Sequence, residues 1–417
     1  MDSRRGFLKL GLGGLAAVIA DAKQVRITGI DIYPIRLPAS KDEIEAGAQT
    51  TYNVVEVTTD AGVKGYSFAG PAVSQLVGVR QLLMGKDLFA IERHLADGLE
   101  KWGGVEHALW DAIGRIAKQP VYRLLGGARN RVTPYITCVW SGKADQQHVS
   151  YREQAEQALR LKKAGYKGMK IRAWRPNPLD DADACTEIRA ATGPDFAGMF
   201  DRTAHAPESV GQTVWSFETG LKTARALQRA GAYWIEEPFA RDDFDSPAKL
   251  AAMVDIPVTG GEGYLGVGAF QKCLEHRTYD ILQPEGERSG GIFSCRKVAF
   301  MAEAYHVPCI LHGTMGLRLA GWLQATLAIG ATWQEVALVT PPMIPQQQWA
   351  PGLKVLRSKE MYRIENGDLV ASDLPGLGLD VVPEALAEYR TRELAGAPAR
   401  APSDSRAKPD TSWRSPA

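Results

Sequence analysis

The chain has 417 residues, of which 45% are hydrophobic and 23% are charged, proportions typical of a soluble globular protein. Its 49 lysine and arginine residues nearly balance its 48 aspartate and glutamate residues, giving a net charge of +1. That balance argues against the basic surface by which many proteins bind nucleic acid. The five cysteines are scattered and never form a C-x-x-C spacing, which argues against a disulfide framework or a zinc knuckle.

The first 22 residues have the order of a bacterial export signal. Arg4 and Arg5 are adjacent and are followed by Phe-Leu-Lys, which resembles a twin-arginine signal. The apolar stretch Leu10–Ala20 is shorter than the ~20 residues that span a bilayer, and an A-x-A-like cleavage site follows at Ala20–Ala22. We therefore expect residues 1–22 to be a signal peptide and the mature protein to be periplasmic, with no membrane association after the signal is removed. The alternative is an ordinary N-terminal helix with two chance arginines.

Residues 23–130 are predicted to form a separate α+β domain. Its expected elements are two strands and three helices, at Val25–Leu37, Tyr52–Thr59, Val73–Met84, Ala90–Leu99 and Gly104–Ile116. The polar loop Ala39–Thr51 between the two strands is long for a hairpin and is a candidate lid.

Residues 131–375 are predicted to form a parallel barrel, because strand and helix patterns alternate there. The expected strands are Val132–Val139, Gly168–Trp174, Phe196–Asp201, Tyr233–Glu237, Ile256–Glu262, Asp280–Glu285, Val307–His312 and Trp333–Leu338. The expected helices include Tyr151–Lys163, Glu218–Ala230, Pro247–Val254, Ile292–Ala304 and Leu317–Ile329. Residues 396–417 are rich in Pro, Ala, Ser and Arg, and we expect a disordered tail.

Charged residues follow these strands at their carboxyl ends, where a barrel assembles its active site. They are Lys170, Arg172, Asp201, Glu236, Glu262, Glu285, His312 and Glu335. Asp201, Glu236 and Glu262 come from successive strands, so their carboxylates would repel one another unless a cation lay between them. Three oxygen ligands with open positions suit Mg²⁺. The sequence therefore predicts a magnesium site, whereas any one of these acids alone would be taken for a solvated loop residue.

Taken together, these residues resemble the mandelate racemase and muconate lactonizing enzyme branch of the enolase superfamily. The resemblance rests on Lys170-Ile171-Arg172, Asp201, Glu236-Glu237-Pro238, Gly261-Glu262, Gln283-Pro284-Glu285 and His312, and on Ala108–Gly114 in the first domain. It implies an α/β fold with a modified (β/α)7β barrel of the triosephosphate isomerase type beneath an N-terminal α+β capping domain, with residues 376–395 packing back onto that cap. It also implies Mg²⁺-assisted removal of a proton α to the carboxylate of a small-molecule substrate, an acid–histidine dyad of Glu285 and His312, and a homo-oligomer, as is common among relatives.

Three positions depart from the pattern of that branch. Arg172 stands where racemases carry a lysine, Glu285 where aspartate is usual, and Thr203 where many relatives have asparagine. These departures make it difficult to transfer a known substrate to this chain.

We expect dehydration of an acid sugar to a 2-keto-3-deoxy acid, because that reaction needs only one base. His312 titrates near neutrality and is suited to that role, with a structural histidine as the alternative, whereas arginine stays protonated. The alternative is a racemase, epimerase or cycloisomerase of the same superfamily, and racemisation would use Lys170, its pKa lowered by Arg172, as a second base. Glu335 would bind the substrate carboxylate or cap the barrel, and the roles of His205 and Glu237 stay open.

Parts of the sequence also fit two other functions. Gly261–Gly266 satisfies G-x-G-x-x-G, and Asp280 follows at a suitable distance for a nicotinamide-dependent oxidoreductase. Glu262 would place negative charge in the cradle meant for pyrophosphate, so we reject that function. A non-catalytic exported protein that binds sugar acids is the second alternative, and the presence of both the carboxylate triad and the base argues against it.

Overall fold

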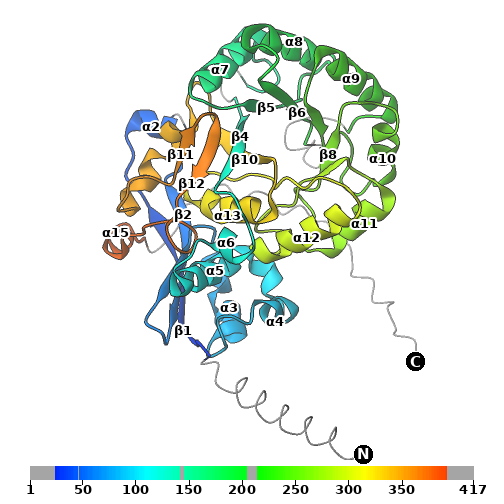
Figure 1. The fold of residues 1–417 in the computed structure, drawn as a ribbon. Helices are drawn as coiled ribbons and strands as arrows, with labels where there is room; N and C mark the ends of the chain where they lie inside the picture. Colours follow the sequence, from blue (N-terminus) through cyan, green and yellow to red (C-terminus); the bar gives the residue numbers. More distant parts are fainter. Residues whose placement is uncertain (1–23, 46, 141–144, 204–213, 392–417) are drawn as a thin grey trace, which may run out of the picture.

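The computed structural model describes residues 24–391 except 46, 141–144 and 204–213. The predicted signal peptide, His205 and the predicted tail lie outside the described residues. The structure confirms an α/β protein with an N-terminal capping domain and a barrel (Figure 1).

The capping domain combines a three-stranded antiparallel sheet with helices. Its strands β1 (Ile27–Arg36), β2 (Thr51–Thr59) and β3 (Lys64–Ser67) pair in chain order. Its helices are α2 (Lys41–Glu45), α3 (Leu76–Leu83), α4 (Ile91–Ala96), α5 (Gly103–Ala117) and α6 (Val121–Leu124), with 3₁₀ turns at Val73–Gln75 and Leu99–Trp102. Helix α5 packs closely on β3. The close approach needs glycine at position 65, where a Cβ would lie only 2.2 Å from the carbonyl oxygen of Ala108. The predicted lid loop contains the short helix α2 and returns to β2.

The barrel strands run parallel in chain order from β4 to β9, and β10 pairs with β4. They are β4 (Arg131–Cys138), β5 (Gly168–Arg172), β6 (Ala197–Asp201), β7 (Trp234–Glu236), β8 (Val258–Gly260), β9 (Ile281–Leu282) and β10 (Trp333–Val339). The segment predicted as a strand at Val307–His312 forms only isolated parallel bridges, from Cys309 to Leu282 and from His312 to Glu285. A further bridge from Thr314 to Val336 completes the barrel.

Helices surround the outside of the barrel (Figure 1). They are α7 (Tyr151–Lys163), α8 (Asp180–Thr192), α9 (Phe217–Ala230), α10 (Asp245–Ala251), α11 (Gly268–His276), α12 (Ile292–Ala304) and α13 (Leu319–Ile329), the last preceded by a 3₁₀ turn at Gly316–Arg318. The bounds of α7 and α12 match the prediction. Ser150 explains where α7 begins, because its side chain accepts from the Glu153 amide while the Glu153 carboxylate accepts from the Ser150 amide.

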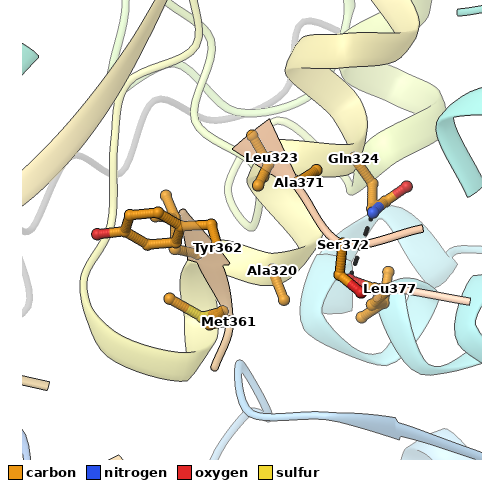
Figure 2. Close-up of a pocket in the computed structure, with 9 residues that line it drawn as sticks. Ala320, Leu323, Gln324, Met361, Tyr362, Ala371, Ser372 and Leu377 are labelled. Atoms are coloured by element: carbon orange, nitrogen blue, oxygen red, sulfur yellow. Dashed lines mark hydrogen bonds between the residues drawn. The ribbon is translucent and has the colours of Figure 1, made fainter. Parts of the chain in front are cut away.

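The end of the chain contains elements that the sequence did not indicate. After α14 (Pro345–Trp349) and a 3₁₀ stretch at Ala350–Val355, strands β11 (Tyr362–Glu365) and β12 (Asp368–Ala371) form a hairpin. Strand β12 then pairs antiparallel with the beginning of β4. Figure 2 shows Leu323 and Gln324 of α13 facing this hairpin, and the Gln324 amide donates to the carbonyl of Leu377 at 3.3 Å.

Helix α15 (Pro383–Glu388) leads the described chain back to the cap. The amide of Arg36 donates to the carbonyl of Tyr389, and the amide of Thr391 donates to the carbonyl of Pro34, both at 3.0 Å. The resemblance implied this return of the chain onto the cap.

Buried hydrophobic residues form one cluster that runs through cap and barrel, and a smaller second cluster. The second cluster contains Tyr135, Met199, Trp234, Ile281 and Ile310. Lys170 Nζ lies 6.0 Å from the centre of the Tyr135 ring. The second cluster therefore lies next to a buried charged side chain. No helix in the described part of the chain has both the length and the apolar composition that a membrane crossing requires.

Candidate active site

The structure brings together the three carboxylates that were predicted to bind a metal. Asp201 ends β6 and pairs in register with Glu236, which ends β7. Glu262 lies two residues beyond β8. Each residue offers a carboxylate oxygen within 4.8 Å of the others, and all three residues are buried. Convergence of parallel strand ends therefore builds the cluster.

Lys170 lies beneath these carboxylates with no solvent exposure. Its Nζ is 2.7 Å from Glu236 Oε1, 3.0 Å from Glu335 Oε1 and 3.5 Å from Asp201 Oδ2. Burial lowers the pKa of an amine, but these carboxylates outweigh burial and raise the pKa of Lys170 above its ordinary value. Lys170 is thus a buried counter-charge with no exposed surface.

Arg172 and Thr203 hold Asp201 from the other side. The Arg172 guanidinium donates to Asp201 Oδ2 and, at 2.7 Å, to the hydroxyl of Thr203. Asp201 Oδ1 accepts from the Thr203 amide at 2.7 Å and from its hydroxyl at 2.8 Å. Thr203 has φ 50°, in the left-handed region where asparagine is common and β-branched residues are rare. The backbone of Thr203 is therefore strained, and in this conformation its amide and hydroxyl both donate to Asp201.

Glu262 lies between two basic side chains. Arg241 Nη2 is 3.2 Å from Glu262 Oε1, and His312 Nε2 is 2.9 Å from Glu262 Oε2. The same Arg241 guanidinium also donates to Glu237, whose role the sequence left open. Arg241 was absent from the predicted site residues, and the only sequence signal for it is its four-residue spacing from Glu237.

The acid–histidine dyad expected from the resemblance is not formed as a side-chain contact. The backbones of Glu285 and His312 are bridged, but the Glu285 carboxylate accepts from the amides of Glu287 at 2.8 Å and Arg288 at 2.7 Å. The extra methylene of glutamate lets the side chain bend back onto its own turn. His312 Nδ1 is buried without a hydrogen-bond partner in the described structure, and the imidazole faces Glu262 instead.

Glu335 was expected to bind the substrate carboxylate or to cap the barrel, and the structure shows which groups contact it. It is fully buried within β10, where Oε1 accepts from the Thr137 hydroxyl and contacts Lys170, and Oε2 accepts from the Gly313 amide at 2.8 Å. Burial favours a neutral acid, yet Lys170, His312 and these hydrogen bonds lower the pKa of Glu335 to about 2. In this structure Glu335 fixes Lys170 and the chain that follows His312.

The electrostatics of the cluster fit a divalent cation. Burial, opposed by Lys170 and reinforced by the other acids, raises the pKa of Glu236 to about 8. Burial lowers the pKa of His312, but Glu262 and Glu335 outweigh it and raise that pKa to about 9. The part of each shift that comes from neighbouring acids reflects an excess of carboxylate charge. The donor set is entirely carboxylate oxygen, which suits a hard ion such as Mg²⁺.

Known protein families match both parts of the chain. A family described as "Enolase C-terminal domain-like" matches residues 151–385. A family described as "Mandelate racemase / muconate lactonizing enzyme, N-terminal domain" matches residues 33–126.

Among similar proteins are several acid-sugar dehydratases. Arabinonate dehydratase of Saccharolobus solfataricus is 31% identical over 69% of this chain and 72% of its own length. D-galactonate dehydratase of Ralstonia nicotianae is 32% identical over 69% of this chain and 73% of its own length.

Solved structures agree on the fold. D-glucarate dehydratase from Agrobacterium tumefaciens, complexed with magnesium, covers 89% of this chain and 100% of its own, at 26% identity and a TM-score of 0.75. A racemase from Streptomyces coelicolor with bound magnesium matches at 21% identity and a TM-score of 0.68, covering 88% of this chain and 100% of its own.

Proposed function

Because this chain belongs to the mandelate racemase and muconate lactonizing enzyme family of the enolase superfamily, we propose that it dehydrates an acid sugar. The reaction removes the proton α to the substrate carboxylate and expels the 3-hydroxyl as water, giving a 2-keto-3-deoxy acid. The arabinonate and galactonate dehydratases among its relatives support this substrate class. The observation that carries the choice of reaction is the full burial of Lys170 against three carboxylates.

Asp201, Glu236 and Glu262 would hold Mg²⁺. When bound there, Mg²⁺ supplies positive charge that stabilises the charge developing on the substrate carboxylate and offsets the Glu262 charge acting on His312. Arg172 adds a permanent cation beside Asp201. With 9% of its side chain exposed, against none for Lys170, Arg172 is the cation of the basic pair that faces solvent.

In this proposal His312 moves the proton. Its side chain is 20% exposed, more than those of Glu262, Arg172 or Lys170. The imidazole Nε2 takes the α-proton, and the resulting imidazolium donates it to the departing 3-hydroxyl. One proton is removed and one is returned, so the loss of water needs no second base. The enol that remains tautomerises to the keto acid.

Racemisation needs a base on each face of the α-carbon, and the described residues offer a poor second one. Lys170 has no exposed surface and three carboxylate partners. Arg172 keeps its proton at any physiological pH. This geometry favours dehydration over the racemase and epimerase alternatives within the same superfamily, and the substrate screen distinguishes it from a cycloisomerase.

A substrate screen tests the proposal. Purified protein with Mg²⁺ is incubated with a library of aldonic and aldaric acids, hydroxy acids and N-acyl amino acids, and 2-keto acid is measured with semicarbazide. We expect keto acid from at least one acid sugar and none after exhaustive chelation. Mg²⁺ binding without product from any acid sugar, and without hydrogen exchange at the α-carbon, would instead support a non-catalytic binding protein.

We also propose that the protein is exported folded and acts in the periplasm, on the basis of Arg4, Arg5 and the Ala20–Ala22 site. Replacing both arginines by lysine should retain the protein, with its signal uncleaved, in the cytoplasmic fraction. Unchanged export of that variant would refute the twin-arginine route.

A further inference from the structure

We propose that Arg241 is a positioning residue for the metal site, which ties the Glu262 carboxylate to Glu237 and thereby sets the affinity for Mg²⁺. The inference rests on the proposed magnesium site. Arg241 Nε is 3.3 Å from Glu237 Oε1, and Nη2 is 3.2 Å from both Glu237 Oε2 and Glu262 Oε1. A single planar guanidinium thus joins two carboxylates, a geometry that the point charge of lysine cannot reproduce.

Glu262 is the member of the triad that most needs such a tether. Asp201 and Glu236 lie within the strand ladder, where backbone hydrogen bonds fix them. Strand β8 ends at Gly260, so Glu262 lies outside the ladder. Its side chain is 11% exposed, against 1% for each of the other two. Its position therefore depends on side-chain contacts.

Glu237 and the backbone of Arg241 are themselves held in place by the fold. Glu237 directly follows the Glu236 ligand, is buried, and has φ 45°. The carbonyl of Arg241 accepts from the Tyr264 hydroxyl at 2.8 Å, which links the loop after β7 to the loop after β8. The guanidinium consequently holds Glu262 against a fixed partner.

Gly263 supplies an independent observation. A Cβ built on it would lie 1.6 Å from Arg241 Nη1 and 1.8 Å from Cζ. The backbone φ of Gly263 is not in the left-handed region, so its backbone conformation does not call for glycine. The space that a side chain would take there is filled by the Arg241 guanidinium. This accounts for Gly263 in the Gly261–Gly266 pattern without a dinucleotide.

The tether makes a directional prediction. Arg241→Met should weaken Mg²⁺ binding about 10- to 100-fold, the range for loss of a partner that orients a metal ligand. Arg241→Lys should weaken it less, because charge is kept but the fork is lost. If Arg241 acted only as a cation competing with Mg²⁺, its removal would tighten binding instead.

Gly263→Ala offers a test that leaves both charged residues in place. The new methyl group should displace the guanidinium and weaken Mg²⁺ binding to a similar extent. The double variant Arg241→Met with Gly263→Ala should bind no more weakly than the weaker single variant, because both act on one contact.

The experiment is calorimetric titration of Mg²⁺ into chelator-treated full-length protein, with the Mg²⁺-induced shift of the thermal midpoint as a second readout. Matched controls are Arg225→Met, at an exposed arginine of α9, and Gly268→Ala, where an added Cβ meets no atom within 4 Å. Both controls should bind like wild type. If Arg241→Met does not fold, the folded Arg241→Lys and Gly263→Ala variants decide.

The outcomes separate the inference from the proposed function. A wild-type protein that does not bind Mg²⁺ overturns the magnesium site itself. A wild type that binds, beside Arg241 and Gly263 variants with unchanged or tighter affinity, overturns the tether and leaves the site standing. A wild type that binds, beside variants that all bind more weakly, supports both.

Discussion

Two groups of buried carboxylates in this protein have different partners. Glu106 and Asp111 on α5 accept mainly from backbone amides. Glu106 accepts from Ile292 at 2.8 Å and Phe293 at 3.0 Å, and Asp111 accepts from Tyr66 at 2.9 Å and Leu377 at 2.8 Å. Asp111 adds one cationic partner, Arg115, at 2.6 Å, whereas the triad of Asp201, Glu236 and Glu262 faces several cationic side chains and its own members.

The difference teaches that burial of an acid does not by itself mark a functional site. Backbone amides are fixed by the fold, so Glu106 serves to join the cap to the first turn of α12, whose N-cap residue Gly291 has no side chain to offer. At the triad, the negative charge of the carboxylates exceeds the positive charge of the neighbouring side chains. A metal ion can neutralise the remaining negative charge. Each of the following predictions tests this contrast.

The largest expected effect is on activity at the triad. Glu236→Gln removes a metal-ligand charge and should lower the dehydration rate by at least about 1,000-fold, since metal-ion stabilisation amounts to several kcal/mol. The variant should still fold because Gln keeps the shape of the side chain, but its thermal midpoint should fall, because the new amide NH₂ must face one of the donors of Lys170, Trp234 or Gln283. Full activity in this variant would place Glu236 with Glu106 as a structural acid.

The second effect is on stability at the cap. Glu106→Ala leaves two buried amides and the Trp110 indole without their acceptor, at about 1–3 kcal/mol for each unsatisfied group. We expect a loss of about 3 kcal/mol in the free energy of unfolding, measured by urea titration. Wild-type stability in this variant would mean that the cap does not depend on this contact.

The third effect is the pH dependence of that contact. Burial outweighs the hydrogen bonds to Glu106 and raises its pKa from 4.5 to about 7. The folded state therefore binds the proton more tightly than the unfolded state, and the stability that Glu106 adds falls as pH rises from about 4.5 to 7. Relative to Glu106→Gln, wild-type stability should fall by up to about 1.4 kcal/mol per pH unit in that window. Parallel pH profiles for the two proteins would contradict the assignment.

The smallest effect is at Thr203, where strain and function oppose each other. Thr203→Val removes the hydroxyl that bridges Asp201 and Arg172, and should weaken Mg²⁺ binding about 10-fold, the lower end of the range for such partners. Thr203→Asn suits the left-handed backbone and should raise stability by about 1 kcal/mol. The control is Thr203→Ser, which retains the hydroxyl. Equal Mg²⁺ affinity in the Val and Ser variants would show that the hydroxyl does not contribute to Mg²⁺ binding.

The triad was predictable because parallel strands converge at their carboxyl ends. The strand pattern alone was enough to predict that Asp201, Glu236 and Glu262 lie close together. The start of α7 was equally local, since Ser150 and Glu153 form its cap. These features depend on short stretches of sequence and on a general rule of barrel geometry.

Other features depend on contacts that no local pattern encodes. The expected strand at Val307–His312 shrinks to bridges, and the β11–β12 hairpin packs on β4 from a distant part of the sequence. The carboxylate of Glu285 accepts from the amides of Glu287 and Arg288, and this contact depends on the side-chain rotamer, which the sequence does not specify. Arg241 reaches Glu262 only because two loops meet and Gly263 leaves space between them.

The most direct test of the account is the fate of the α-proton in deuterated water. Wild-type protein with Mg²⁺ and a responsive acid sugar should form a 2-keto-3-deoxy acid with loss of the α-proton. His312→Asn should lose both the keto product and exchange of the α-proton, while retaining its fold and its binding of Mg²⁺. Clean inversion at C2 with deuterium incorporation and no keto acid would contradict the dehydration and show that a second base acts at this site.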